Sequence, residues 1–188
     1  MELILALCMG IGLSSACGYR IFMPPLIINI ACHAGYMNLN PDFNWLTSEV
    51  AFFVLLIASG LEIGAYYVPW LDNLLDTISV PTSVIAGTIL TASFITNTHP
   101  LLAWTLSAIV GGGASGLTSA STGLLRLGST GMTGGLANPI ISTVENFLSL
   151  ILSILSIVLP IIMIVLIVLM PFFAIKVFKK IKLRRIIA

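Results

Sequence analysis

The sequence predicts an all-α integral membrane protein with about five hydrophobic segments, two of them broken by Gly and Pro or re-entrant. Of its 188 residues, 58% are hydrophobic and only 8% are charged, whereas soluble domains carry roughly a quarter charged residues. The mean hydropathy is +1.11. The hydrophobic residues also gather in runs close to the ~20 residues that a helix needs to cross a bilayer. A soluble fold would have too few charged side chains to cover its surface.

The first hydrophobic segment is expected at residues 3–31, where Gly18, Arg20 and the Pro24–Pro25 pair interrupt the apolar run. These interruptions predict a broken helix or a re-entrant loop. The second segment is expected at residues 46–68. Aromatic side chains stand at both of its ends, which is typical of the two membrane interfaces; they belong to Trp45, Tyr66, Tyr67 and Trp70.

The run WLDNLLDTIS, at residues 70–79, predicts a short amphipathic helix at the membrane interface. Its apolar residues share one face, whereas Asp72 and Asp76, four residues apart, share the other face. A third hydrophobic segment is expected at residues 80–96. Pro81 then falls in the first turn of its helix, where proline is well tolerated.

The fourth segment begins near Pro100 and enters residues 111–135, where nine of 25 residues are Gly and eight are Ser or Thr. This stretch is the second candidate for a broken or re-entrant segment. The fifth segment extends over about residues 139–173, which is longer than one crossing requires. Asn138 is expected to cap the N-terminus of its helix, and Pro160 predicts a kink in it.

We expect one transmembrane domain over residues 1–175, followed by a basic tail at residues 176–188. Six of the eight Lys and Arg residues lie in this tail. Positive charge directly after a hydrophobic segment is typical of the cytoplasmic side of a membrane. The C-terminus is therefore expected in the cytoplasm, where the tail can also contact anionic lipid headgroups.

Two stretches of the chain resemble each other, GLSSACGYR at residues 12–20 and GLTSASTGLLR at residues 116–126. If repeat halves at residues 1–68 and 100–175 flank a single third span, they enter the membrane from opposite sides. This is the inverted repeat of many transporters, whose binding sites lie where broken helices of both halves meet. The alternative is that the glycines only let helices pack closely, within one chain or in a homo-oligomer.

Arg20 and Arg126 are the first candidates for a functional site, because an ionisable side chain inside an apolar segment is costly and usually functional. Each belongs to a Gly/Ser/Thr-rich run whose backbone N–H groups, together with the guanidinium, can bind a small anion. The alternative is an ion pair of Arg20 or Arg126 with Glu62 or Glu145. The hydroxyl groups expected to line the same pathway are those of Ser14, Ser15, Thr118 and Ser119.

Glu62, Asp72 and Asp76 form a second candidate group near one end of the second segment. Oxygen-rich groups of this kind suit Mg²⁺ or Ca²⁺, or they relay protons. Tyr66 follows Glu62 by one helical turn and is expected to donate a hydrogen bond to it. The ordinary interpretation is that Asp72 and Asp76 form the solvated face of an interfacial helix.

The sequence contains no enzyme motif. It has no HExxH, Walker or nucleophile-elbow pattern, and Ser14, Ser15 and Ser119 have no evident base partner. Nothing in it indicates a nucleic-acid partner or a bound cofactor. We expect a protein without enzymatic activity, whose partners are the lipid bilayer, other copies of the same chain and a small ion or anion.

Three parts of the chain carry a resemblance to a known family: MELILALCMGIGLSSACGYRIFMPPL, LEIGAYYVPWLDNLLDTISVP, and the combination of GGGASGL with TGGLANPI. They resemble the bacterial family called domain of unknown function 4126, and YYVPWLDNLLDTI is the most specific part. The resemblance covers nearly the whole chain. It implies a small, single-domain, multi-pass protein of the bacterial inner (cytoplasmic) membrane, and it implies no activity.

The leading hypothesis is a small membrane transporter or channel for an ion or small polar solute, with the two Gly/Ser/Thr-rich segments lining its pathway. Arg20 and Arg126 would bind an anion or form salt bridges that gate the pathway, and Glu62 would carry a coupling proton or cation. The alternative is a structural membrane protein that binds lipids or partner subunits and transports nothing. A weaker alternative is the binding of an apolar, quinone-like cofactor between the helices.

Overall fold

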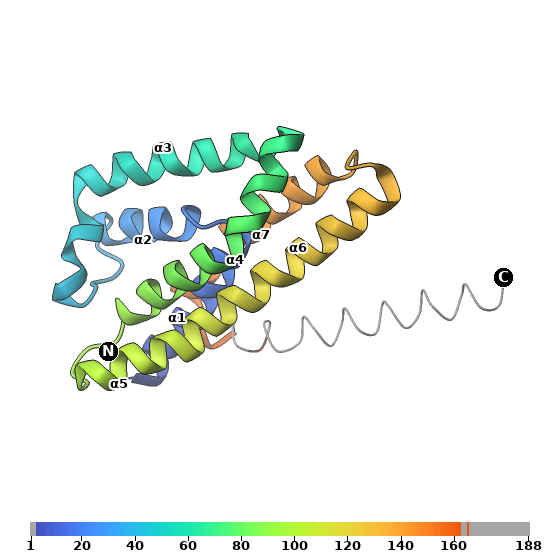
Figure 1. Ribbon diagram of the computed structural model, residues 1–188. Coiled ribbons are helices and arrows are strands. Elements are labelled where there is room, and N and C mark those ends of the chain that lie inside the picture. The colour runs from blue at the N-terminus through green and yellow to red at the C-terminus, as the bar shows by residue number, and fades with distance from the viewer. Residues whose placement is uncertain (1–2, 163–164, 166–188) are drawn as a thin grey trace.

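The computed structural model describes residues 3–162 and 165, and all regular structure in this part of the chain is helical (Figure 1). The predicted basic tail at 176–188 and the end of the predicted fifth segment lie outside the described residues. The elements are α1 (Leu3–Tyr19), α2 (Met23–His33), the 3₁₀ helix η1 (Pro41–Thr47), α3 (Glu49–Ala65), α4 (Pro69–Ala92), α5 (Pro100–Leu106), the π-helix η2 (Ser107–Gly112), α6 (Gly113–Thr133) and α7 (Asn138–Val158).

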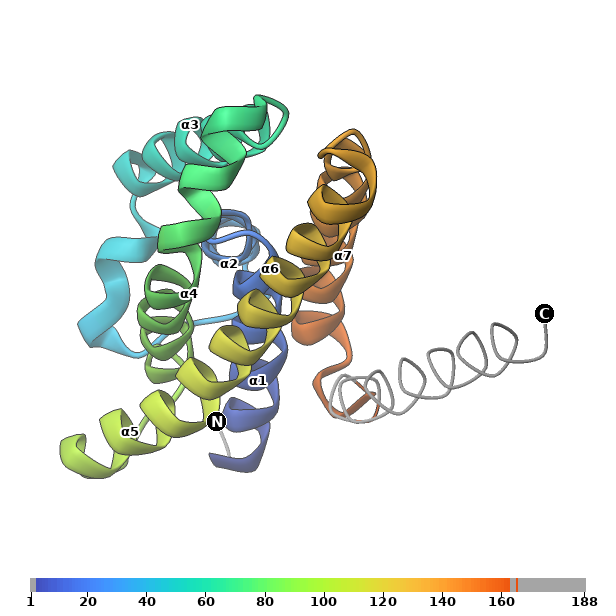
Figure 2. The same ribbon diagram turned by 45° about the vertical axis from the view of Figure 1, so that its right-hand side comes forward.

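Helix α1 is the centre of the molecule. It packs against α4, α6 and α7 (Figure 2), and its last three turns are buried on every side. A helix that is apolar all round belongs inside a bundle. Helices α2 and α3 pack against each other outside this bundle, with η1 between them. The fold is therefore a bundle of α1, α4, α6 and α7 with an outer pair of helices.

Three helical segments are long and apolar enough to cross a membrane, Leu74–Ala92, Pro100–Thr133 and Asn138–Val158. The pair of η1 and α3, bent by 60°, makes a fourth if the two are one span. Helices α1 and α2 are apolar but shorter. The helical fold is thus compatible with a membrane protein, with three or four long apolar segments where the sequence predicted about five.

The first hydrophobic segment is broken at the predicted place. Helix α1 ends at Tyr19 and α2 begins at Met23, which leaves residues 20–22 as a link outside both helices. Pro24 and Pro25 follow in the first turn of α2, where the missing N–H of a proline removes no helical hydrogen bond. The link carries the first of the two arginines into the bundle.

The Gly-rich stretch is helical, which corrects the prediction of a broken or re-entrant fourth segment. Elements α5, η2 and α6 form one continuous run over Pro100–Thr133, and its irregular part is the π-helical turn η2. Glycine disfavours helix in water, but unpaired backbone groups of an irregular chain are costlier at membrane depth. The run ends at Gly134, whose left-handed φ of 64° is readily adopted by glycine.

The two similar stretches lie in helices that run in the same direction. Gly10 of α1 and Gly111 of η2 both face Thr91 of α4 at one end of the bundle, and Gly18 of α1 faces Thr118 of α6 further along. Helices α1 and α6 are therefore parallel (Figure 2), whereas an inverted repeat would make them antiparallel. The structure does not support the predicted inverted repeat. The shared small residues instead belong to one helix interface.

Residues 69–92 form one helix, α4, instead of a short interfacial helix followed by a separate third segment; Pro81 lies inside it. The orientation of its first turns is also the reverse of the predicted one. Asp72 is 1% exposed, whereas Leu74 is 54% exposed. The acidic face points into the protein because a charge facing hydrocarbon is far costlier than a leucine facing it. Asp72 and Asp76 are not the solvated face of an interfacial helix.

Helix α7 begins close to its predicted start, but it ends at Val158, whereas the sequence predicted a kink at Pro160 within a longer segment. Asn138 is its first residue and Ala137 occupies the N-cap position, so the predicted cap is displaced by one residue. The helix ends at Val158, and Leu159 leaves the helical conformation directly before Pro160. The residue before a proline disfavours the helical conformation for steric reasons, which explains this end.

Glycines let α4 approach α1, η2 and α6 closely. A Cβ added at Gly87 of α4 would lie 2.8 Å from the carbonyl oxygen of Gly111 in η2. The hydroxyl of Ser14 donates a hydrogen bond to the Gly87 carbonyl at 2.7 Å. Small residues with a hydroxyl beside them are the usual means by which membrane helices associate. The bundle depends on this close approach.

We predict that Gly87→Ala lowers the thermal unfolding midpoint of the detergent-solubilised protein. The added Cβ overlaps backbone of η2, which moves only if the helices separate, and overpacking of this kind costs about 1–3 kcal/mol. Gly123→Ala is the matched control, because open space surrounds Gly123 and alanine is the better helix former. Equal losses of midpoint in the two variants would contradict glycine-mediated packing.

Candidate functional site

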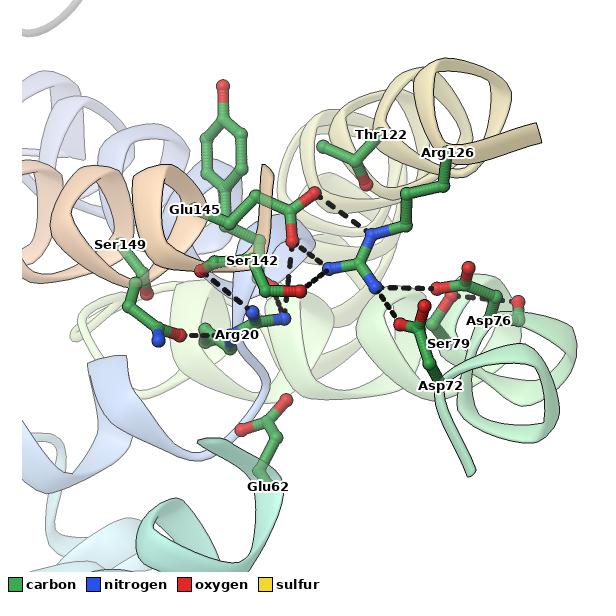
Figure 3. Close-up of polar contacts among 12 residues, drawn as sticks. Arg20, Glu62, Asp72, Asp76, Ser79, Thr122, Arg126, Ser142, Glu145 and Ser149 are labelled. Carbon is green, nitrogen blue, oxygen red and sulfur yellow. Dashed lines mark hydrogen bonds and ion pairs between the residues drawn. The ribbon is translucent and has the colours of Figure 1, made fainter. Parts of the chain in front are cut away.

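Arg126 of α6 is surrounded by three carboxylates from two other helices (Figure 3). Its Nε donates to Glu145 Oε1 at 3.3 Å, and its Nη2 pairs with the other oxygen of Glu145. Its Nη1 pairs with Asp72 and lies 3.5 Å from Asp76 Oδ1. Nη2 also donates to Ser142 Oγ at 3.1 Å. The guanidinium is buried, and each of its three nitrogens is engaged.

Arg20, in the link between α1 and α2, joins the same cluster. Its Nη1 lies 3.3 Å from Glu145 Oε2, and its Nε donates to Asn146 Oδ1. Its Nη2 donates to the backbone carbonyl of Ser142 at 3.0 Å. Glu145 therefore pairs with both arginines and ties the link and α6 to α7.

The ring of Tyr66, the residue after α3, lies beside both guanidinium groups. Its centroid is 4.0 Å from Cζ of Arg20 and 4.2 Å from Cζ of Arg126. Both distances are within the range of cation–π attraction. The sequence predicted that Tyr66 donates a hydrogen bond to Glu62, whereas the structure places its ring against the two arginines.

Glu62, in the last turn of α3, is buried beside the link. Its Oε1 accepts a hydrogen bond from the backbone N–H of Ile21 at 2.8 Å, and its Oε2 accepts one from Phe22 at 3.1 Å. Figure 3 shows it apart from the chain of ion pairs that joins the other charged residues. Within the described part of the chain, no cationic group lies within ion-pair distance of Glu62.

The charges of this cluster do not balance. Each arginine has carboxylate partners, but the carboxylates outnumber the arginines by two when every group is ionised. The six residues are Arg20, Glu62, Asp72, Asp76, Arg126 and Glu145. An uncompensated charge in a buried position is strongly destabilising. Burial therefore favours the binding of a proton or another cation by part of this surplus.

A small cavity lies among these groups. Its water-accessible volume is about 10 Å³, which is room for about one water molecule. The charged residues around it include Arg20, Glu62 and Asp76, and hydroxyl groups complete its wall; these belong to Ser79, Ser119 and Thr122. The Asp76 side chain is 23% exposed, so the cluster is partly open on the α4 side.

The structure brings together all the charged candidates of the sequence analysis. Of the hydroxyl candidates, Ser119 lines the cavity and donates to Ser79 Oγ at 3.2 Å. The other three do not line it. Ser14 bonds to α4, Thr118 donates to the Ala114 carbonyl at 2.9 Å, and Ser15 is buried in α1. These three residues belong to helix packing.

The predicted cation site of Glu62, Asp72 and Asp76 does not form as a metal site. In the part of the chain that the structure describes, no group of three or more His, Cys, Asp or Glu side chains is arranged to hold a metal ion. Asp72 and Asp76 instead flank Arg126, and its guanidinium supplies the positive charge that a metal would supply.

Sequence reasoning found Glu145 of α7 but missed Ser142 and the contacts that Asn138 and Asn146 make in the cluster. The side-chain amide of Asn138 donates to Asp72 Oδ2 at 3.0 Å, and Ser142 and Asn146 bond to the arginines. A signal was present, because buried polar residues recur every three or four positions and so form one stripe of an apolar helix. The stripe consists of Asn138, Ser142, Glu145, Ser149, Ser153 and Ser156.

The family model for domain of unknown function 4126 (DUF4126) matches residues 7–180, a range that contains every member of the cluster. The chain belongs to this family. No curated protein and no solved structure is significantly similar to it. The match confirms the resemblance seen in the sequence. Because the description of the DUF4126 family names no activity, the chemistry of the cluster is the basis for an assignment.

Two chemical capacities follow from the cluster of this DUF4126 chain. Its ion pairs join α4, α6, α7 and the link after α1, so the cluster stabilises the bundle. Its surplus of carboxylates beside a water-sized cavity also allows a proton to bind and leave. Stabilisation of the bundle depends on Glu145, whereas proton binding depends on the carboxylates that are less tightly paired with arginine.

We predict that Glu145→Gln lowers the thermal unfolding midpoint in detergent far more than Glu49→Gln does. Glu145 pairs with both arginines, and removal of one partner of a buried ion pair costs about 3–5 kcal/mol. Glu49 is an exposed carboxyl of α3, where a substitution changes stability by about 0.5 kcal/mol or less.

The double variant Glu145→Gln with Arg126→Gln tests the pairing itself. It should lose less stability than the sum of the two single variants, because both single changes remove the same Arg126–Glu145 contact, which the double change removes only once. Additive losses would show that Glu145 and Arg126 do not stabilise the bundle through their contact.

Proposed function

We propose that this DUF4126 chain is a small membrane transporter or channel for an ion or small polar solute, and that its buried charge cluster binds and releases a proton. The surplus of carboxylates over arginines beside a water-sized cavity carries this proposal. Ionisable side chains buried between membrane helices typically mark ion pathways and proton relays.

A proton suits the cluster better than an anion does. The guanidinium groups of Arg20 and Arg126 already bond to carboxylates, amides and carbonyls, so an anion would have to displace one of these partners. The excess negative charge also repels an anion. A proton needs no vacant ligand sphere, and the cavity has room for the water molecule that would carry it.

Asp76 is the proposed entrance for the proton. It is the most exposed carboxyl of the ion-paired group, and it lines the cavity together with Ser79 and Ser119, whose hydroxyl groups are hydrogen-bonded to each other. Glu62 stands on the same cavity wall. A single water molecule would complete a polar route from Asp76 to Glu62.

The proposed location is the bacterial inner membrane, with the C-terminus in the cytoplasm. The positive charge of the last 13 residues supports this orientation. Assembly as a homo-oligomer remains a prediction of the sequence. Gly60 and Gly64 on the exposed side of α3 have open space around them, and this four-residue spacing lets helices of two copies approach closely.

The second candidate is a structural membrane protein that transports nothing. The close helix contacts at Gly18, Gly87 and Gly111 favour it, because they leave no passage between α1, α4 and α6 beyond the cluster. If the protein is structural, the charge cluster serves only to hold the helices together. The charged and hydroxyl-lined cavity gives no support to a quinone-like cofactor.

We predict that purified protein in liposomes catalyses an ion flux that Asp76→Asn reduces about tenfold or more, because that change removes the entrance carboxyl. The measurement uses a trapped pH dye under an imposed pH gradient, followed by fluxes of Na⁺, K⁺ and Cl⁻. Glu49→Gln, an exposed carboxyl change outside the cluster, is the matched control and should keep the wild-type flux.

The flux experiment also separates the two candidates. Fluxes of all four ions equal to those of protein-free liposomes would overturn the transport proposal in favour of the structural one. A flux that Asp76→Asn and Glu49→Gln leave equally unchanged would exclude the cluster from the pathway.

A further inference from the structure

Glu62 has a different role from the other carboxylates, because it caps a helix to which it does not belong. The link at residues 20–22 frees the backbone N–H groups of Ile21 and Phe22 from helical hydrogen bonds, and the two carboxylate oxygens of Glu62 accept both. Phe22 occupies the N-cap position of α2 and provides no side-chain cap itself. A carboxylate at the N-terminus of a helix is favourable because the N–H groups there carry partial positive charge.

The same contact attaches α3 to the bundle. Ser59 and Glu62 are the two buried residues of α3, whereas most of its apolar side chains, such as Phe53, Ile57 and Leu61, point outward. Helix α3 packs against α2 and η1. The two N–H bonds of Glu62 therefore fasten the C-terminal end of α3 to the link between α1 and α2.

This attachment depends on the charge of Glu62. An ionised carboxylate accepts two N–H bonds with equal oxygens, and hydrogen bonds to a charged group are about twice as strong as neutral ones. A protonated carboxyl has a hydroxyl that is a donor and a poor acceptor. When a proton from the solvent forms an O–H bond on one oxygen, the N–H bond at that oxygen is lost and the other weakens.

The surroundings of Glu62 favour the uptake of a proton. Arg20, which lines the same cavity, is bonded to Glu145 and Asn146 instead. The charged and titratable groups that share the cavity with it come from α1, the link, α4, α6, α7 and the end of α3, and are Cys17, Tyr19, Arg20, Tyr66, Asp76, Arg126 and Glu145. Burial and the surplus of carboxylates favour the neutral form, while the two N–H groups favour the charged form, so the two states compete.

We propose that Glu62 is the proton-binding residue of this protein and that its protonation releases the end of α3 from the link between α1 and α2. The charged state holds the link and α3 together, and the neutral state lets them separate. This inference rests on the proposed function, because release of α3 from the link is the step by which proton binding would open a pathway. It also makes a structural claim that is measurable without transport.

The test is hydrogen–deuterium exchange of the full-length protein in detergent, read at peptides that cover residues 20–26 and 59–68. At neutral pH, Glu62→Gln should exchange about tenfold faster than wild type at the Ile21 and Phe22 amides, because a charge-assisted hydrogen bond becomes a neutral one. Exchange in wild type, corrected for the intrinsic effect of pH, should rise toward that of Glu62→Gln as the pH falls. Glu62→Gln should show no such rise.

Two controls test whether the pH dependence comes from Glu62. Ser59→Ala changes the other buried residue of α3 and should leave the pH dependence of exchange intact. Infrared difference spectra of wild type on acidification should contain a carboxylic-acid C=O band that Glu62→Gln lacks. The wild-type pH series tests the release of the link from α3 even if the variant does not fold.

Equal exchange of wild type and Glu62→Gln at every pH, or no carboxylic-acid band assignable to Glu62, would overturn the inference. These outcomes are separable from a failure of the transport proposal. A pH-dependent contact without ion flux would support the proton-binding contact and refute transport. An ion flux that Asp76→Asn reduces, together with hydrogen–deuterium exchange that Glu62→Gln leaves unchanged, would support transport and refute this role of Glu62.

Discussion

The arrangement of the helices depends on the neutralisation of two arginines in an apolar surrounding. Arg20 comes from the link after α1 and Arg126 from α6, and the two meet at one carboxylate, Glu145. A buried guanidinium without a partner is prohibitively costly, so this meeting fixes how far α6 and α7 reach along α1. Asp72 then fixes the start of α4 against Arg126. The ends of four helices are set by one connected group of charges.

The bundle has a tightly packed part and a polar part. Near Thr91 the helices approach through glycines, with Gly10 and Gly111 on either side of the threonine. Toward the link between α1 and α2, charged and hydroxyl side chains replace the glycines and leave a water-sized cavity. Close packing resists deformation, whereas the polar part contains bonds that change with protonation. Movement of the protein is therefore expected at the polar end.

The sequence was most informative about ionisable side chains, because their burial in an apolar segment costs the most free energy. An arginine in an apolar segment needs a partner or a function, and this reasoning identified Arg20 and Arg126 as site residues and Glu145 as a partner. It was least informative about orientation. Asp72 and Asp76 suggested a solvated face, because amphipathic helices in water expose their charged residues. In helices surrounded by lipid, the charged residues face the protein interior instead. The helical Gly-rich stretch was missed since helix propensities measured in water do not hold where unpaired backbone is so costly.

The separation of the cluster's members along the chain has a consequence for how the protein is made. Arg20 lies 126 residues before Asn146, to which it bonds, and Glu145 is the neighbour of that asparagine. During synthesis from the N-terminus, Arg20 is therefore made long before the carboxylate that neutralises it exists. Helix α1, the centre of the finished bundle, packs against α4, α6 and α7, and α7 is the last of these three to be made. Helix α7 completes the site that Arg20 occupies, and a truncation between Arg126 and Glu145 leaves both arginines without their shared partner.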